Sequence, residues 1–108
     1  MLNMILSPGK TLLEDITAAK EAGFTEDFMF QNSYLVGRSN KIKYTEKECK
    51  LIESCRHEGM SDPSDASILF LIECADGTKG CLSSAYGIGA DTDLIEFIVA
   101  IKRNQSKN

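Results

Sequence analysis

Apolar residues at helical spacing follow a capping motif near the start of the chain. Thr11 and Glu14 have the spacing of a capping box, in which each side chain bonds the backbone N–H of the other residue. Gly23 stands where a helix ends in the left-handed conformation, and Phe24 follows it to pack on the last turn. The pattern predicts a helix over 12–22, with an inward stripe of Leu12, Leu13, Ile16 and Ala19.

The hydrophobic period then changes to two, as in a β-strand. Alternation over 28–36 predicts a first strand, and the polar segment 37–43 predicts an exposed loop. Thr45 to Glu48 repeats the capping-box spacing and predicts a short turn before a second strand over 51–58. That strand is the most polar one, so we expect it at an edge of the sheet.

A β-hairpin is predicted over 67–86, around which the remaining elements are arranged. Its first strand covers 67–74, and Asp76-Gly77 favours a two-residue type I′ turn because both residues tolerate positive φ. That turn would pair Ile72 with Cys81. It would also gather an apolar group on one face of the hairpin: Leu69, Leu71, Leu82 and Tyr86.

The C-terminal segment has the charge pattern of a helix. Acidic Asp91 and Asp93 suit a helix N-terminus, and basic Lys102 and Arg103 suit a C-terminus. We expect its inward stripe to contain Leu94, Phe97, Ile98 and Ile101, widened by Ile95 and Val99.

The order of elements is therefore helix, four strands, helix. It predicts an α+β fold, an antiparallel four-stranded meander with two helices on one face. A chain of 108 residues forms one domain with its own core. We expect this domain to span 1–108, with an N-terminal arm over 1–10 and a frayed tail over 104–108.

Charge and composition exclude several classes of partner. A net charge of -4 disfavours nucleic acid and acidic membranes, both of which attract Lys and Arg. No apolar run has transmembrane length, and the apolar start lacks the cationic region of a signal sequence. The four cysteines contain no close-spaced pair, so we expect reduced thiols in a cytoplasmic protein.

Two long motifs and one short motif carry a resemblance to a known family. They are EGMSDPSDASILF (58–70), DGTKGCLSSAYG (76–87) and GFTEDF (23–28). Together they resemble a family of small bacterial proteins without an established function, some of which are labelled phosphoribosylpyrophosphate synthetase. The resemblance runs from the first helix to Tyr86 and implies a shared fold and a soluble, bacterial origin. It supplies no catalytic residues.

The synthetase activity would need a phosphate loop that the residues do not form. Such a loop places adjacent acids and a Thr/Gly segment after an apolar strand, at the start of a helix. Here 68–72 is followed by Glu73 and Asp76, which are separated, and the chain returns as a strand. The sequence therefore argues against this activity.

Other ligand sets are incomplete. The soft donors that could converge on zinc are Cys55, His57, Cys74 and Cys81. Because the close-spaced ligand pairs of a zinc site are absent, we interpret these residues as core packing. The glycines of 87–89 precede the second helix, but the acids at its start would repel a phosphate. We therefore expect no metal and no cofactor.

Two hypotheses about function remain. The first is a non-enzymatic binding or self-associating module. If both helices cover one side of the sheet, the apolar hairpin face of Leu69, Leu71, Leu82 and Tyr86 is left for a second copy or a protein partner.

The alternative is a small enzyme, or a metal or phosphate-ligand binder, at the acidic loop 58–65. Its candidate binding residues are Glu58, Asp62, Asp65 and Tyr86. Asp62 and Pro63 also fit a type I turn, which explains them without a ligand. No catalytic residue is identified, because His57 is the only histidine and no serine has an activating neighbour.

Overall fold

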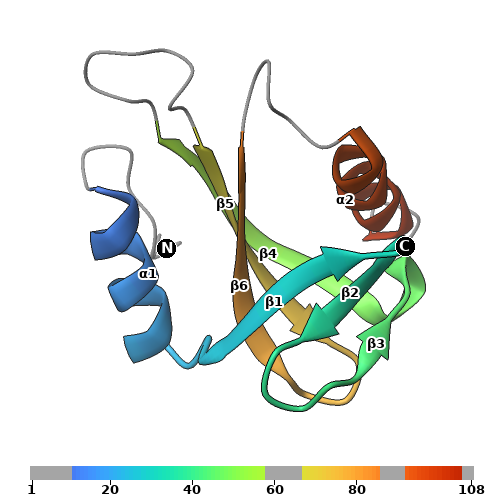
Figure 1. The fold of residues 1–108 in the computed structure, drawn as a ribbon, viewed down its shortest axis with the longest axis horizontal. Helices are drawn as coiled ribbons and strands as arrows, with labels where there is room; N and C mark the ends of the chain where they lie inside the picture. Colours follow the sequence, from blue (N-terminus) through green and yellow to red (C-terminus); the bar gives the residue numbers. More distant parts are fainter. Residues whose placement is uncertain (1–10, 58–66, 86–91, 106–108) are drawn as a thin grey trace.

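Two helices lie on opposite faces of a six-stranded β-sheet (Figure 1). This is a computed structural model, and it describes residues 11–57, 67–85 and 92–105. The elements in chain order are α1 (Leu12–Glu21), β1 (Glu26–Gln31), β2 (Tyr34–Gly37), β3 (Lys43–Tyr44), the 3₁₀ helix η1 (Glu46–Glu48), β4 (Cys49–His57), β5 (Ser67–Cys74), β6 (Lys79–Ala85) and α2 (Thr92–Gln105). The predicted N-terminal arm lies outside the described residues, whereas Asn104 and Gln105 of the predicted tail belong to α2.

The prediction of an α+β domain is confirmed, but the sheet is larger than expected. Its strand order is β3-β2-β1-β6-β5-β4, and all neighbours are antiparallel except β1 and β6. The prediction of a four-stranded antiparallel meander is therefore wrong. The two additional strands arise in 28–44, where the alternation pattern predicted one strand and a loop.

A tight turn divides the predicted first strand into β1 and β2. Asn32 and Ser33 have φ angles of 50° and 66°, as a two-residue type I′ hairpin turn requires. The hairpin pairs Phe30 with Leu35, so Leu35 joins the face that carries Phe28. Asn-Ser is a weaker turn signal than Asn-Gly, and the unbroken alternation concealed it.

The turn between β5 and β6 is one residue longer than predicted. Within the loop 75–77 only Gly77 has positive φ, 93°. Its N–H donates to the Cys74 carbonyl at 2.9 Å, and the Cys74 N–H donates to the Thr78 carbonyl at 2.7 Å. This is a type I turn followed by a glycine bulge, which is typical of a three-residue hairpin loop.

The longer loop shifts the register of the hairpin. Cys81 pairs with Leu71, not with Ile72 as predicted. Because a shift of one residue turns a strand over, Leu82 lies on the face opposite to Leu69 and Leu71. The predicted apolar hairpin face therefore does not exist as one surface.

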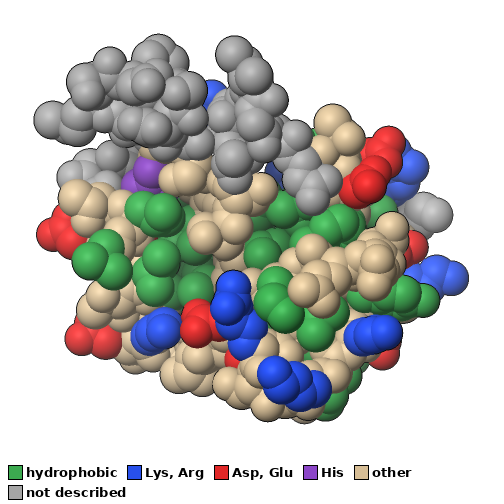
Figure 2. Space-filling model, in the orientation of Figure 1, with side chains coloured by type: hydrophobic (Ala, Val, Ile, Leu, Met, Phe, Trp, Pro, Cys, Tyr) green, Lys and Arg blue, Asp and Glu red, His purple; other side chains and the backbone are tan. Residues whose placement is uncertain are grey.

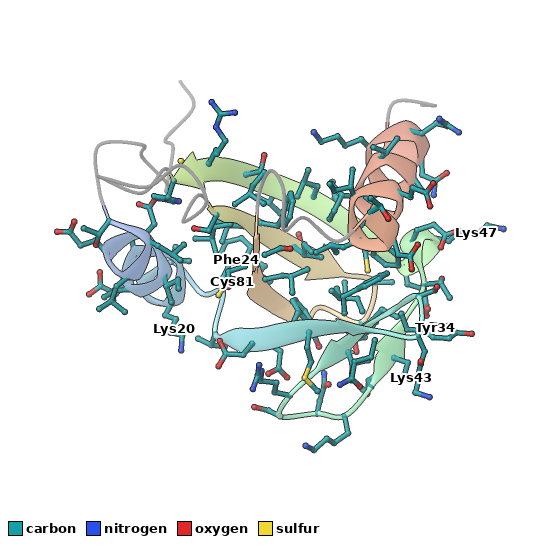
Figure 3. The ribbon with its side chains drawn as sticks, turned by 45° about the horizontal axis from the view of Figure 1, so that its top comes forward. Lys20, Phe24, Tyr34, Lys43, Lys47 and Cys81 are labelled. Atoms are coloured by element: carbon teal, nitrogen blue, oxygen red, sulfur yellow. The ribbon has the colours of Figure 1, made fainter. Side chains whose placement is uncertain are left out.

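Strand β5 is buried on both faces, because α1 covers one and α2 the other. The α1-side cluster consists of Ala19, Phe24, Leu69, Leu71 and Cys81. The larger α2-side cluster includes Phe28, Leu35, Tyr44, Phe70, Ile72, Leu82, Leu94, Phe97, Ile98 and Ile101. Figure 3 shows Phe24 beside Cys81 near α1. The prediction that both helices share one face is wrong, since an apolar strand with two apolar faces needs cover on both.

Both helices bury narrower stripes than predicted. The capping box of α1 is confirmed, with Glu14 donating its N–H to Thr11 Oγ1 at 3.1 Å. However, Leu13 is 72% exposed. The predicted core stripe of α2 is buried as expected, whereas Ile95 and Val99 are 44% and 45% exposed. Neither described helix is long and apolar enough to span a membrane.

Strand β4 lies at an edge of the sheet, as its polarity predicted. A bulge between Leu51 and Glu53 interrupts its pairing with β5. Leu51, before the bulge, packs on the α2-side cluster, and Cys55, after it, packs on the α1-side cluster. The bulge thus turns the last residues of β4 toward α1.

Candidate metal-binding site

A buried polar pair joins α1 to the end of β4. Nε2 of His57 lies 2.6 Å from Oδ2 of Asp15. The two side chains are 8% and 0% exposed. Asp15 is carried on the first turns of α1, which the capping box and the burial of Ala19 hold against the sheet. The pair therefore lies where the helix and the edge strand meet.

Cys55 completes a cluster of three different donor types. One donor atom from each of Asp15, Cys55 and His57 lies within 4.8 Å of the others. Cys55 and His57 are two residues apart on β4, so their side chains project from the same face. Burial, followed by the negative charges of Asp15 and Glu53, raises the pKa of the Cys55 thiol.

His57 has a second ring nitrogen that the described residues do not satisfy. Nδ1 of His57 is buried and has no hydrogen-bond partner among them. A buried polar atom without a partner is costly, since it has lost its hydrogen bonds to water. The imidazole thus has a partner at Nε2 and, among the described residues, none at Nδ1.

The donor set has a recognisable coordination chemistry. Carboxylate oxygen, imidazole nitrogen and thiolate sulfur together are the ligands of zinc and similar divalent transition metals. Two ligands of one zinc ion lie roughly 3.3–3.8 Å apart, given metal–ligand bonds of roughly 2.0–2.3 Å. The 2.6 Å contact between Asp15 and His57 is a hydrogen bond, and an ion would replace it by moving the two side chains slightly apart.

A second polar cluster surrounds Glu26 at the other end of the sheet. Its carboxylate accepts the backbone N–H groups of Asp27, Ser39 and Asn40 at 2.9–3.2 Å. Burial acts to raise the pKa of Glu26, but these hydrogen bonds outweigh it and hold the pKa below its ordinary value. The backbone of the predicted loop 37–43 thus binds a carboxylate of the chain itself.

Tyr44 extends this cluster to the β5–β6 loop. Its hydroxyl donates to Asp76 at 2.8 Å and accepts from the Asn40 amide at 2.9 Å. Hydrogen bonds from the Thr78 backbone and from Tyr44 lower the pKa of Asp76. Next to these residues lies an open polar hollow of about 380 Å³, whose lining includes Thr25, Glu26, Ser39 and Lys79. The Glu26, Tyr44 and Asp76 side chains are each hydrogen-bonded within the chain, so the cluster is best explained as a structural link.

The predicted binding loop is not described by the structure. Glu58, Asp62 and Asp65 lie outside the described residues, and so do Tyr86 and the glycines of 87–89. Of the predicted interface, Leu69 and Leu71 are 0% exposed and Leu82 is 4% exposed. The prediction that these leucines form an exposed face is therefore wrong, because α1 and α2 cover them.

The four soft donors that were considered for zinc and interpreted as core packing are not gathered in one place. Cys55 and His57 lie together on the α1 side, whereas Cys74 belongs to the α2-side cluster. The sequence pattern did not identify Asp15, which adds an oxygen donor to this set. Its signal was present, since Asp15 stands four residues before the buried Ala19 and so on the inward side of the helix.

Figure 2 shows hydrophobic side chains across the middle of one face, with Lys and Arg side chains mostly in its lower part and Asp and Glu toward its sides. No protein-family model, curated protein or solved structure matches the chain. The resemblance to the small bacterial family thus stays a prediction.

Proposed function

We propose that the protein is a non-enzymatic binding module whose ligand is a divalent transition-metal ion, zinc being the first candidate. Asp15, Cys55 and His57 would hold the ion. The observation that carries this proposal is the convergence of one oxygen, one sulfur and one nitrogen donor within 4.8 Å. The proposed binding site therefore lies at the junction of α1 and β4 and not, as predicted from the sequence, on the hairpin face.

The choice of metal follows from the donors. Calcium and magnesium prefer sets made of oxygen ligands alone. A thiol, an imidazole and a carboxylate favour zinc, and three protein ligands leave at least one coordination position for a further ligand. The burial of Asp15 supports the same choice, because a bound cation stabilises a carboxylate that is no longer hydrated.

The test is a titration of the full-length, chelator-treated protein with zinc, followed by calorimetry. We expect one equivalent to bind and to raise the melting temperature, since an ion that binds only the folded state stabilises it. Cobalt in place of zinc should give a thiolate-to-metal absorption band. Asp15→Asn, Cys55→Ser and His57→Gln should each weaken binding at least roughly tenfold, the lower end of what lost metal-site groups cost.

Cys81→Ala is the matched control, because Cys81 is a buried thiol of the same α1-side cluster without a place in the donor set. It should bind zinc like the unchanged protein. Absence of one-to-one binding, or equal affinity in the three ligand variants, would refute the proposal. The Asp15–His57 contact would then be a structural link only.

A second candidate function is self-association through the outer face of α2, with a second copy of the chain as the partner. Ile95 and Val99 lie one turn apart there, and both are nearly half exposed. An apolar patch on one helix can pair with its own copy about a two-fold axis. Light scattering over a concentration series should show a dimer that Val99→Lys abolishes, whereas a monomer at all concentrations would refute it.

We also propose a cytoplasmic location. All four cysteines are free, and thiols are kept reduced in the cytosol. Thiol labelling of freshly lysed cells that express the chain should modify each cysteine after denaturation. A disulfide that involves Cys55 or Cys81, found at once in such lysates, would contradict the proposal.

A further inference from the structure

We propose that Cys49 and Cys74 form a reversible disulfide, so that this pair is a redox-modification site. The inference is independent of the metal site, with which it shares no residue. It rests on the register of β4 and β5 and on the contact between the two thiols.

The two cysteines face each other across neighbouring antiparallel strands. Cys49 is the register partner of Cys74. Next to them, the Ala75 N–H donates to the Glu48 carbonyl at 2.8 Å, whereas the Cys74 N–H points to β6 and donates to Thr78. Because hydrogen-bonded and non-hydrogen-bonded pairs alternate along a ladder, Cys49 and Cys74 form a non-hydrogen-bonded pair.

That type of pair has a geometry close to that of a disulfide. Its Cα atoms lie about 4.5 Å apart and its side chains approach more closely than in the hydrogen-bonded type. Disulfides span Cα separations of about 4.4–6.8 Å. The two thiols already interact, since a hydrogen bond to Cys49 and then burial raise the pKa of Cys74. Little backbone movement is therefore needed to join them.

The position of the pair in the fold decides how an oxidant reaches it. Cys49 and Cys74 are 8% and 3% exposed, so both react slowly in the closed structure. Cys49 is the first residue of β4, the long edge strand, directly after η1. An edge strand has no neighbouring strand on one side and can open locally at its end. Because Cys49 is the end residue, such an opening exposes Cys49 before Cys74.

The oxidant that the reaction needs is a low-molecular-weight disulfide. The Cys49 thiolate attacks one of its sulfurs, which forms a mixed disulfide and releases one thiolate. Cys74 then loses its proton to solvent and attacks the Cys49 sulfur, which releases the second thiolate. Two protein thiols are oxidised to one disulfide, and the oxidant is reduced to two thiols. The same exchange, run with excess thiol, restores both cysteines.

The test is to incubate the reduced, folded, full-length protein with glutathione disulfide, block the remaining thiols and analyse the product by mass spectrometry. We expect a monomeric product lighter by two hydrogens, with a peptide link between Cys49 and Cys74 and with Cys55 and Cys81 alkylated. Dithiothreitol should reverse it, and the oxidised protein should melt at a higher temperature, because the bond restricts the unfolded chain.

Two variants sharpen the result. Cys55→Ala with Cys81→Ala retains the pair and should oxidise like the unchanged protein. Cys49→Ala should instead leave Cys74 unlinked. If Cys49→Ala fails to fold, the peptide map of the unchanged protein still decides the question. A link through Cys55 or Cys81, a stable mixed disulfide, or no oxidation when the denatured chain oxidises would overturn the proposal.

Discussion

Gly80 on β6 lies directly against the backbone of Glu26 on β1. A Cβ atom at position 80 would come within 2.8 Å of the carbonyl carbon of Glu26. The two residues are register partners in the parallel pair that joins β1 to β6. The continuity of the six-stranded sheet therefore depends on the missing side chain at this position.

Gly80→Ala should destabilise the fold by about 2–3 kcal/mol, because the added methyl group meets backbone that cannot rotate away. Urea denaturation measures the change in the free energy of unfolding. Gly77→Asn is the matched control. Gly77 has open space around it and φ of 93°, so the added side chain meets no atom and its cost is backbone strain alone. Asparagine bears that strain better than most residues, so the cost should be smaller, about 1 kcal/mol. An equal loss in both variants would contradict the steric explanation.

The buried Asp15–His57 pair should contribute more stability than an exposed ion pair. Asp15→Ala leaves the His57 ring without this partner and should cost about 2–3 kcal/mol. The comparison is Asp27→Asn, which removes the Lys20–Asp27 ion pair, whose side chains are 46% and 51% exposed. That change should cost less than about 1 kcal/mol. Thermal unfolding in the presence of a chelator separates this effect from metal binding, and similar losses would argue against a role for burial.

Glu26 should make the fold sensitive to acid. Its pKa is lower in the folded protein than its ordinary value of 4.5. The stabilisation is therefore complete above pH 4.5 and is lost as the pH falls through the lower, folded pKa. Glu26→Gln has no such proton to bind, so its unfolding free energy should fall less steeply over this range.

Chemical denaturation at a series of acidic pH values measures how steeply the free energy of unfolding falls with pH. Glu14→Gln is a suitable comparison, because this carboxylate lies on the exposed side of α1, where it accepts the Thr11 N–H at 2.8 Å. It should alter the slope less than Glu26→Gln does. If the free energies of unfolding of the unchanged protein and Glu26→Gln fall in parallel with pH, the hydrogen bonds to the Glu26 carboxylate do not control acid stability.

The Tyr44 hydroxyl should stabilise the contact between β3 and the β5–β6 loop. Tyr44→Phe removes the bond to Asp76 and should cost about 1–2 kcal/mol, because the ring is buried and the hydroxyl bonds a charged group. Tyr34→Phe is the control, since Tyr34 is 40% exposed and its loss of a hydroxyl should cost less than about 0.5 kcal/mol. Guanidinium unfolding of both variants measures the difference, and equal stability would contradict it.

Elements with strong local signals were predicted well. The capping box of α1, the bounds of β5, the turn at Thr45 and the core stripe of α2 each depend on neighbouring residues. The errors in strand number and hairpin register share one cause, which is turn geometry. Asn32-Ser33 has little turn signal, and Asp76-Gly77 fits both a two-residue and a three-residue loop. A difference of one residue in the second turn was enough to move Leu82 to the other face.

The candidate metal site could be predicted only in part. Cys55 and His57 stand two residues apart on a strand, a spacing that places both side chains on one face, and they lie together in the donor set. Asp15 is distant in the sequence, 42 residues from His57, and no pattern on one element reveals which helix will cover which strand. The opposed pair of Cys49 and Cys74 was hidden for the same reason, because it depends on the register of two strands.

By itself, then, the sequence determined the helices, most of the strand positions and the α+β class, since these follow from hydrophobic period, capping and charge along a short stretch of chain. Only the tertiary structure decided the parallel pairing of β1 with β6, the opposite faces taken by the helices, and the meeting of Asp15, Cys55 and His57. These depend on which surfaces bury each other, and burial is a property of the whole packed chain and not of any segment within it.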